Sequence, residues 1–127
     1  MNTYLETADD KTMLIVQIEH VNAVNNIDQI LDTPGLDGIC IGPNDLSGSY
    51  GVLGKINHPD VQNAIDIVIA KVKKTNLFLG VATYYEQQNV KMWIGKGVQF
   101  IALNTDYANL YRRSKEIIDD VKSIKRS

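Results

Sequence analysis

The chain has 127 residues, of which 44% are hydrophobic and 22% charged, and its formal net charge at pH 7 is −2. This length and composition are typical of a single globular domain, and no apolar run approaches the roughly 18–20 residues of a membrane span. The weak negative charge gives no electrostatic footprint for nucleic acid or an anionic membrane, so neither is an expected partner.

The expected location also follows from the composition. Charged residues near the start, Glu6, Asp9 and Lys11 among them, do not fit a secretory leader. The single cysteine, Cys40, lies in an apolar run and fits a small buried residue in a reducing compartment. We therefore expect a cytoplasmic protein.

Runs of apolar residues and helical spacings alternate along the chain. The first run, 13–19, predicts a strand covered on both faces, and the apolar spacing over 21–31 predicts a helix. Thr33-Pro34-Gly35 ends that helix, and 37–41 form the next strand. A glycine-rich loop over 48–54 follows.

The second half of the chain repeats the pattern. His58-Pro59-Asp60 opens a helix that reaches Val72, with proline near the first turn where its missing N–H costs nothing. The remaining elements expected are strands over 77–82 and 98–103 and helices over 85–94 and 107–124. Trp93 lies on an amphipathic helix and is expected in the core or an interface.

The order βαβαβαβα with short connections predicts a parallel α/β sheet with right-handed crossovers. Four βα units are half of a TIM (β/α)8 barrel, whose usual length is about 250 residues. A doubly wound open sheet is the alternative, but no Gly-x-Gly-x-x-Gly follows the first strand.

Two acidic residues fall at the carboxyl ends of neighbouring predicted strands. Glu19 closes the first strand, and Asp45 lies in the segment Gly42-Pro43-Asn44-Asp45-Leu46-Ser47, directly after the second. Ligands bind at this edge in parallel α/β folds. Two carboxylates beside a Gly-Pro turn suit a hard divalent metal and an oxyanion ligand. Alone, Glu19 could instead complement a helix dipole and Asp45 could cap a turn.

Longer motifs resemble a known family. The chain resembles the HpcH/HpaI aldolases over about Tyr4 to Val121, nearly its whole length, and specifically the small-acid branch. The segments that carry the resemblance are Gln17-Ile18-Glu19, Ala23-Val24, Asn26-Ile27, Gly35-Leu36-Asp37-Gly38, Ile41 to Ser47, Gly51, His58-Pro59 and Gly80. The resemblance implies a metal-dependent class II aldolase or lyase that acts on a pyruvate-like 2-oxo acid through a metal-stabilised enolate. It also implies one partial barrel domain over 1–127, corresponding to the C-terminal half of a barrel of the pyruvate/phosphoenolpyruvate type.

The resemblance assigns roles to individual residues. Glu19 and Asp45 match the ligands of a Mg²⁺ or Mn²⁺ ion, and Gln17 matches a residue that contacts the substrate. Asn44 and Asp45 match the pair whose backbone amides hold the substrate carboxylate, and the turn at Gly42 belongs to the same expected substrate site. Mg²⁺ commonly takes only one or two protein carboxylates, which fits this set.

The chain also departs from the family. The catalytic histidine and the arginine of that family come from the first half of the barrel; His20 and His58 match neither. The catalytic residues are therefore unknown. Asn104-Thr105-Asp106 stands where family members usually carry Gly-x-Asp, which puts the geometry of that loop in question. Asp106 could cap a helix or line the site. The only arginines, Arg112, Arg113 and Arg126, lie on or beyond the last predicted helix.

Three hypotheses remain open. The first is an aldolase-type lyase present as the C-terminal half of its site. The second is a non-catalytic half-barrel that binds a metal and a keto acid, and the third is one part of a split enzyme. Four strands expose two edges and an apolar inner face, so we expect a homo-oligomer or a complementary half-barrel to cover them.

Overall fold

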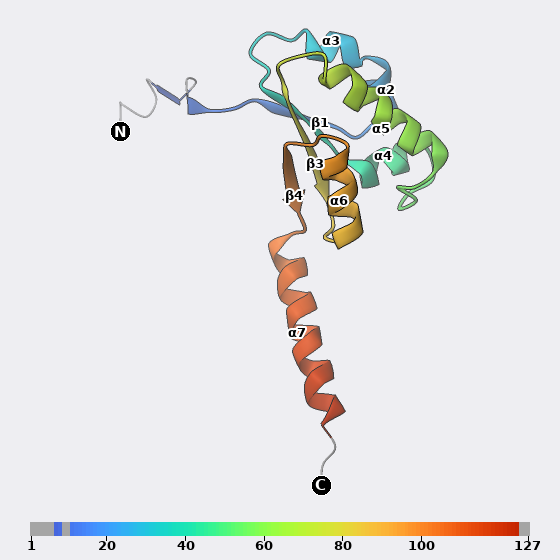
Figure 1. Ribbon diagram of the computed structural model, residues 1–127, viewed down its shortest axis with the longest axis vertical. Coiled ribbons are helices and arrows are strands. Elements are labelled where there is room, and N and C mark those ends of the chain that lie inside the picture. Colours follow the sequence, from blue (N-terminus) through green and yellow to red (C-terminus); the bar gives the residue numbers. More distant parts are fainter. Residues whose placement is uncertain (1–6, 9–10, 125–127) are drawn as a thin grey trace.

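The computed structural model describes residues 7–8 and 11–124 of the chain. Within these residues one parallel sheet forms, and its strand order, β1-β2-β3-β4, follows the sequence. The strands are β1 (Ile15–Ile18), β2 (Gly38–Ile41), β3 (Phe78–Thr83) and β4 (Phe100–Leu103). Helices connect successive strands (Figure 1), so the predicted succession of four βα units is confirmed. Glu6, Asp9 and Arg126, considered above, lie outside the described residues.

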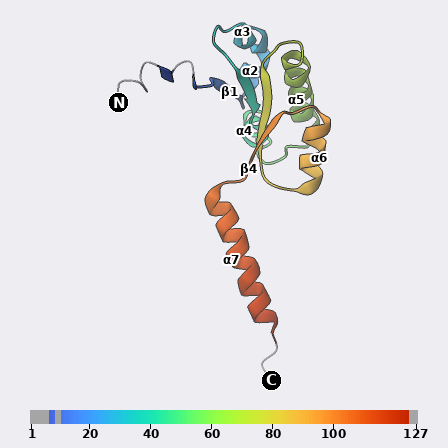
Figure 2. The ribbon, with the colours of Figure 1, turned by 60° about the vertical axis from the view of Figure 1, so that its left-hand side comes forward.

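Most of the helices cover a single face of the sheet. They are α2 (Val21–Asn25), α3 (Ile27–Leu31), α4 (Pro43–Ser49), α5 (Pro59–Val72), α6 (Gln87–Gly95) and α7 (Asp106–Ser123). Figures 1 and 2 show α2 to α6 on one side of the strands, whereas α7 extends away from the sheet. None of the residues of α7 is buried. Among the helices of the described residues, none is both long enough and apolar enough to cross a membrane.

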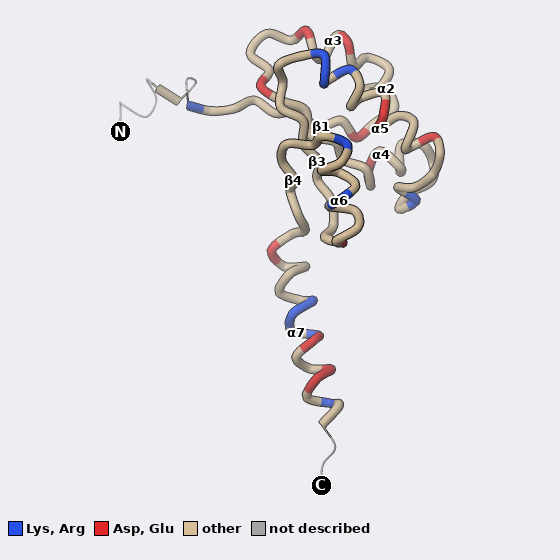
Figure 3. Tube along the Cα trace, viewed as in Figure 1, with Lys and Arg blue, Asp and Glu red and all other residues tan. Residues whose placement is uncertain are grey.

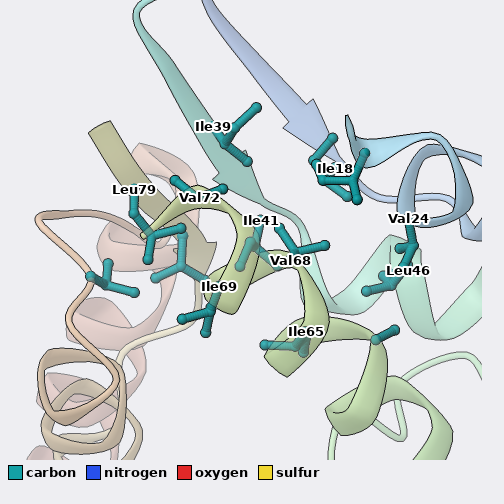
Figure 4. Close-up of a cluster of buried hydrophobic side chains, with 14 of the residues drawn as sticks. Ile18, Val24, Ile39, Ile41, Leu46, Ile65, Val68, Ile69, Val72 and Leu79 are labelled. Atoms are coloured by element: carbon teal, nitrogen blue, oxygen red, sulfur yellow. The ribbon is translucent and has the colours of Figure 1, made fainter. Parts of the chain in front are cut away.

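The core lies between the sheet and these helices. Alternate strand residues point toward the helices, and Ile39, Ile41 and Val81 are fully buried there. Figure 4 shows Ile39 and Ile41 beside the apolar stripe of α5, including Ile65 and Val68, and Val81 belongs to the same cluster. The spacing of apolar residues along α5 thus gives the buried face that was predicted from the sequence.

Within residues 7–8 and 11–124, no helix lies over the opposite face of the sheet. Ile15, Gly38 and Phe78 are register partners on this face, and Ile15 and Phe78 are 38% and 46% exposed. One layer higher, the ring of Phe100 occupies the space over Gly80, where an added Cβ would clash with the ring. We call this surface the inner face, because it corresponds to the interior of a closed barrel.

Two predictions about helices were wrong. The single helix expected over 21–31 is divided at Asn26, whose φ of −104° and ψ of 18° are not helical. The side chain of Asn26 donates to the carbonyl of Asn22 at 2.8 Å, a local bond that competes with regular helix. The second error concerns residues 43–49, which form α4, although no helix was predicted there.

The other element predictions differ from the structure in position only at their ends, as expected when termini are assigned from pattern alone. The first strand was also expected to be covered on both faces, and this was wrong: Ile15 is 38% exposed, because the inner face of the sheet is uncovered in the described part of the chain. The loop after α4 contains two glycines with positive φ, Gly51 at 74° and Gly54 at 80°. Cys40 is buried, and burial, followed by the charge of Glu19, raises the pKa of its thiol. Trp93 is fully buried in the core, which confirms that prediction.

Candidate functional site

The predicted site residues meet at the carboxyl ends of β1 and β2. The backbone N–H of Gly42 donates to the carbonyl of Ile18 at 3.0 Å, which extends the pairing of these strands by one residue. A Cβ added at Gly42 would lie 2.6 Å from Nε2 of Gln17 and 3.2 Å from Oε2 of Glu19. The side chains of Gln17 and Glu19 therefore occupy the space that a glycine at this position leaves free.

The residues after Gly42 form the first turn of α4. Gly42 is the N-cap and Pro43 the first helical residue, so Asn44 and Asp45 follow with N–H groups that have no acceptor within the helix. Both side chains are exposed. The turn predicted from the Gly-Pro pair is thus a helix start, which still leaves these backbone groups free.

Leu46 and Ser47 hold this helix in place. Leu46 is fully buried, and the Oγ of Ser47 donates to the carbonyl of Asn44 and accepts from the N–H of Gly54 at 2.9 Å. Ser49, which the sequence analysis did not single out, accepts from the N–H of Val21 at 3.1 Å. This bond joins the end of α4 to the segment directly after Glu19.

A cavity of about 260 Å³ lies at this edge of the sheet. Four of the five predicted site residues line it, and the rest of the wall comes from the ends of β3 and β4. The lining residues are Gln17, Gly42, Asn44, Asp45, Ala82, Thr83, Tyr84, Ala102, Asn104 and Thr105. We call this the site cavity. Glu19 is not among its lining residues and reaches it only through the contact at Gly42.

The size of the cavity follows from the strand register. Ala82 pairs with Ala102, and Gly42 follows Ile41, the partner of Val81. Three small residues therefore lie side by side at the top of the inner face, and their short side chains leave an open space above Phe100 and Gly80. The wall residues of β3 and β4 were not selected as site residues from the sequence. Glu19 was selected because ligands bind at the carboxyl ends of parallel strands. The wall residues also lie at such ends, so the same argument could have selected them.

Asn104 resolves the question raised by the missing glycine. Its φ is 55°, the left-handed region that glycine adopts freely and that asparagine tolerates better than most residues. Its Oδ1 accepts from the N–H of Tyr85 at 2.8 Å, and its Nδ2 donates to Oδ1 of Asn109 at 2.8 Å. The loop therefore keeps a glycine-like backbone, and the side chain of Asn104 joins the β3–α6 loop to the first turns of α7.

The remaining polar candidates serve mainly as helix caps. His20 and His58 are the N-caps of α2 and α5, where each Nδ1 accepts a backbone N–H. Asp106 accepts from the N–H of Tyr107 at 2.7 Å and does not line the site cavity. The prediction that His58-Pro59-Asp60 opens a helix is confirmed, and His20 is exposed.

The carboxylates of Glu19 and Asp45 are the candidate ligands of a divalent metal. Glu19 and Asp45 form no ion pair or side-chain hydrogen bond with any other residue that the structure describes, so both carboxylates are available. No cluster of three or more histidine, cysteine or acidic residues that could hold a metal occurs within residues 7–8 and 11–124. Two carboxylates with water and ligand oxygens fit Mg²⁺ or Mn²⁺ but would not fit a tetrahedral zinc site.

The comparisons with known proteins agree with this architecture. The family model described as HpcH/HpaI aldolase/citrate lyase matches residues 3–112. The chain belongs to this family. It is 37% identical over 114 residues to a 4-hydroxy-2-oxo-heptane-1,7-dioate aldolase of Escherichia coli, covering 90% of this chain and 43% of that protein. It is also 37% identical over 112 residues to a hydroxypyruvate/pyruvate aldolase of Agrobacterium fabrum, covering 86% and 42%.

A solved structure supports the fold. The crystal structure of an HpcH/HpaI aldolase from Desulfitobacterium hafniense superposes with a TM-score of 0.85 at 27% identity, over 98% of this chain and 48% of that one. The chain thus spans about half the length of the relatives that it matches. Its four βα units correspond to half of a barrel of the TIM type, which confirms the predicted fold class.

Proposed function

We propose that this chain supplies the keto-acid and metal half of an aldolase site, the C-terminal half, and that the reaction is carbon–carbon cleavage of a 4-hydroxy-2-oxo acid. The single observation that carries the proposal is the site cavity. Gln17, Gly42, Asn44 and Asp45 converge on one small space at the ligand-binding edge of a family member's sheet. Its volume of about 260 Å³ is small for a ligand pocket and suits a short acid such as pyruvate.

Each residue has a defined role in this proposal. The free N–H groups of Asn44 and Asp45 would hold the carboxylate of the 2-oxo acid, and the amide of Gln17 would donate to its oxygen atoms. The carboxylates of Glu19 and Asp45 would hold Mg²⁺ or Mn²⁺. When bound, the cation would act as a Lewis acid that polarises the ketone. Gly42, which has no Cβ, leaves room for the side chains of Gln17 and Glu19.

The reaction also needs groups that the described residues lack. In cleavage, the C3–C4 bond breaks, its electron pair passes to the 2-oxo acid as an enolate, and the 4-hydroxyl gives up its proton to a base. Neither histidine lines the site cavity, and both Nδ1 atoms already accept backbone N–H groups. The base and a cation for the aldehyde oxygen would therefore come from the first half of a barrel, on this chain's partner or in a longer protein.

The inner face supports the same conclusion. Ile15 and Phe78 leave 38% and 46% of their surface exposed on this face, whereas Ile39, Ile41 and Val81 on the other face of the sheet are fully buried. Burying such apolar area is favourable by roughly 25 cal/mol per Å². A complementary half-barrel or a second copy of this chain would cover the inner face. Sedimentation of a stable monomer at micromolar concentration would contradict this part of the proposal.

The cytoplasmic location stays a prediction.

No histidine lines the site cavity, and its one carboxylate, that of Asp45, is assigned to the metal. This favours one other candidate, a half-barrel that binds a metal and a keto acid without turnover. Exchange of deuterium into the methyl group of pyruvate distinguishes the two functions. Exchange by the chain, alone or with a first-half partner, supports the enzyme. Tight binding without any exchange under either condition supports the binding module.

Calorimetry tests the binding part directly. Mg²⁺ should bind more tightly in the presence of oxalate, a stable analogue of the enolate form, because oxalate supplies oxygens that the protein lacks. Glu19→Ala and Asp45→Ala should each abolish this synergy. Glu116→Ala is the matched control, because its exposed carboxylate pairs with Arg113 on α7, outside the site cavity. Unchanged synergy in both site variants would refute the metal assignment.

A further inference from the structure

The site cavity offers few donors to a carboxylate. Among the described residues, no lysine or arginine lines it, and Figure 3 shows none along α4. The N–H of Asp45 is one of the free backbone donors, since no side-chain hydrogen bond caps the start of α4. Apart from the proposed cation, a carboxylate bound here depends on hydrogen bonds, whose strength depends on the direction of each donor. The group that fixes the direction of this N–H therefore matters for binding.

Ser47 has an unusual environment for a hydroxyl. It is fully buried on α4, and in the described part of the chain it is the only polar or charged residue that is buried. Burying a hydroxyl is unfavourable unless it keeps its hydrogen bonds. Ser47 keeps two, because its Oγ donates to the carbonyl of Asn44 at 2.5 Å and accepts from the N–H of Gly54 at 2.9 Å. A partner on each side thus fixes the direction of this hydroxyl.

The bond to Asn44 acts on a peptide unit of the site. The carbonyl of Asn44 and the N–H of Asp45 belong to one planar unit, and in a trans peptide these two groups point in opposite directions. A hydrogen bond that holds the carbonyl therefore also fixes the direction of the N–H. Asn44 and Asp45 both line the site cavity, whereas Ser47 does not. Ser47 thus acts on a donor of the site through one rigid unit.

The second partner of Ser47 comes from the loop after α4. The backbone carbonyl of Ser47 accepts from the N–H of Val52 at 2.9 Å, so two bonds hold this loop against the helix. Gly51 and Gly54 have φ values of 74° and 80°, which glycine adopts freely, and these turns bring the loop back onto α4. Hydrogen bonds therefore run in series from Gly54 through Ser47 to Asn44, and in such a series each bond polarises the next.

Ser49 provides a comparison on the same helix. Its Oγ donates to the carbonyl of Leu46 at 2.7 Å and accepts from the N–H of Val21 at 3.1 Å. Like Ser47, it bonds the carbonyl three residues earlier and a backbone N–H of another segment. The peptide unit differs, because the carbonyl of Leu46 is joined to the N–H of Ser47, and neither residue lines the site cavity.

We propose that Ser47 is a positioning residue for the carboxylate of the 2-oxo acid. Its buried hydroxyl fixes and polarises the N–H of Asp45, the donor that would bind this carboxylate. The inference rests on the proposed function, which assigns that N–H to the ligand. Because Ser47 acts on a carboxylate donor, its removal should weaken binding of the carboxylate and not binding of the cation. A merely structural Ser47 would affect the free energy of unfolding alone.

Calorimetry of oxalate binding at saturating Mg²⁺ tests this inference. Ser47→Ala should weaken oxalate binding by about fivefold, roughly half the worth of one hydrogen bond to a charged group. Its affinity for Mg²⁺ without oxalate should not change. Ser49→Ala is the matched control and should lose a similar free energy of unfolding in urea while it keeps its oxalate affinity. Ser47→Cys retains a weaker donor and should bind oxalate with intermediate affinity.

A second measurement needs no ligand. Polarisation of the N–H of Asp45 affects the chemical shift of its amide proton in the ¹⁵N-labelled chain. This shift should change more in Ser47→Ala than in Ser49→Ala. If Ser47→Ala does not fold, Ser47→Cys takes its place in both measurements.

The outcomes separate this inference from the proposed function. Unchanged oxalate affinity in the Ser47 variants, or equal losses in Ser47→Ala and Ser49→Ala, overturns the inference and leaves the proposed function standing. An equal fall in the affinity for Mg²⁺ alone also overturns it, because the hydroxyl would then act on the metal ligands. If the unaltered chain does not bind oxalate in the presence of Mg²⁺, the proposed function fails and the role of Ser47 fails with it.

Discussion

Replacing Gly42 by alanine should damage ligand binding while leaving the fold nearly intact. The added Cβ would lie 2.6 Å from Nε2 of Gln17, 3.1 Å from Cβ of Glu19 and 3.2 Å from its Oε2. The nearest atom is the end of a flexible side chain, so Gln17 must move away. Glu19 must shift by a few tenths of an ångström.

The two consequences differ in size. The φ of −107° and ψ of 82° at Gly42 are accessible to alanine, so we expect the free energy of unfolding to fall by less than about 1 kcal/mol. Binding loses the hydrogen bond from Gln17, about 1 kcal/mol, and part of the contact made by Glu19. The combined effect should weaken Mg²⁺-dependent oxalate binding by about tenfold.

Calorimetry and urea unfolding measure these two quantities on the same preparation. Gly95→Ala is the matched control, because a Cβ at Gly95 meets nothing within 4 Å. It should leave oxalate binding unchanged. If Gly42→Ala binds oxalate as tightly as the unaltered chain, the side chains of Gln17 and Glu19 do not form the ligand site.

Three further predictions follow from the structure. Asn104→Gly loses two side-chain hydrogen bonds and should lower the free energy of unfolding by about 1–2 kcal/mol in urea titrations, and Asn104→Ala should lower it by about 1 kcal/mol more because of the positive φ. Because the pKa of the Cys40 thiol is raised in the folded chain, the thiol of the unfolded chain ionises at lower pH. The free energy of unfolding should therefore fall as the pH rises through the ordinary pKa of a thiol. Between about pH 7.5 and about pH 9.5, a smaller fall in Cys40→Ala would measure this contribution. The chain alone should show no aldol cleavage in a coupled assay but should show it when a protein with the first half of the barrel is added. The reason is that a missing base costs typically 10²–10⁴-fold in rate. Rapid cleavage by the chain alone would contradict this and would make His20 and His58 candidate bases again.

The sequence predicted the fold well where the hydrophobic period decides the outcome. The buried stripe of α5 and the apolar strands follow directly from residue spacing, because their burial requires that spacing. The helix over residues 43–49 was not predicted, for a physical reason. Pro43, Asn44 and Asp45 favour turns, and only the burial of Leu46 and the hydrogen bonds of Ser47 make this segment helical.

The site was predictable in part. Strand-end position selected Glu19 and Asp45, and the resemblance to the family added Gln17, Gly42 and Asn44. All of these except Glu19 line the site cavity. The far wall also lies at strand ends, but its residues, such as Ala82, Ala102 and Asn104, carry no charge that marks them as ligands in the sequence. The turn at Asn104 was questioned because glycine was missing, although asparagine also adopts a positive φ.

Manganese broadening of amide signals tests the central claim most directly. Mn²⁺ is paramagnetic and broadens nearby resonances, so a substoichiometric amount added with oxalate to the ¹⁵N-labelled chain locates the ion in one experiment. The account predicts that the amides of Gln17 to His20 and Gly42 to Leu46 broaden first, and that Glu19→Ala or Asp45→Ala removes this selectivity. Broadening that begins instead at the other exposed acidic residues, such as Asp28 or Asp119, would contradict the assignment of a metal and keto-acid site to this half-barrel.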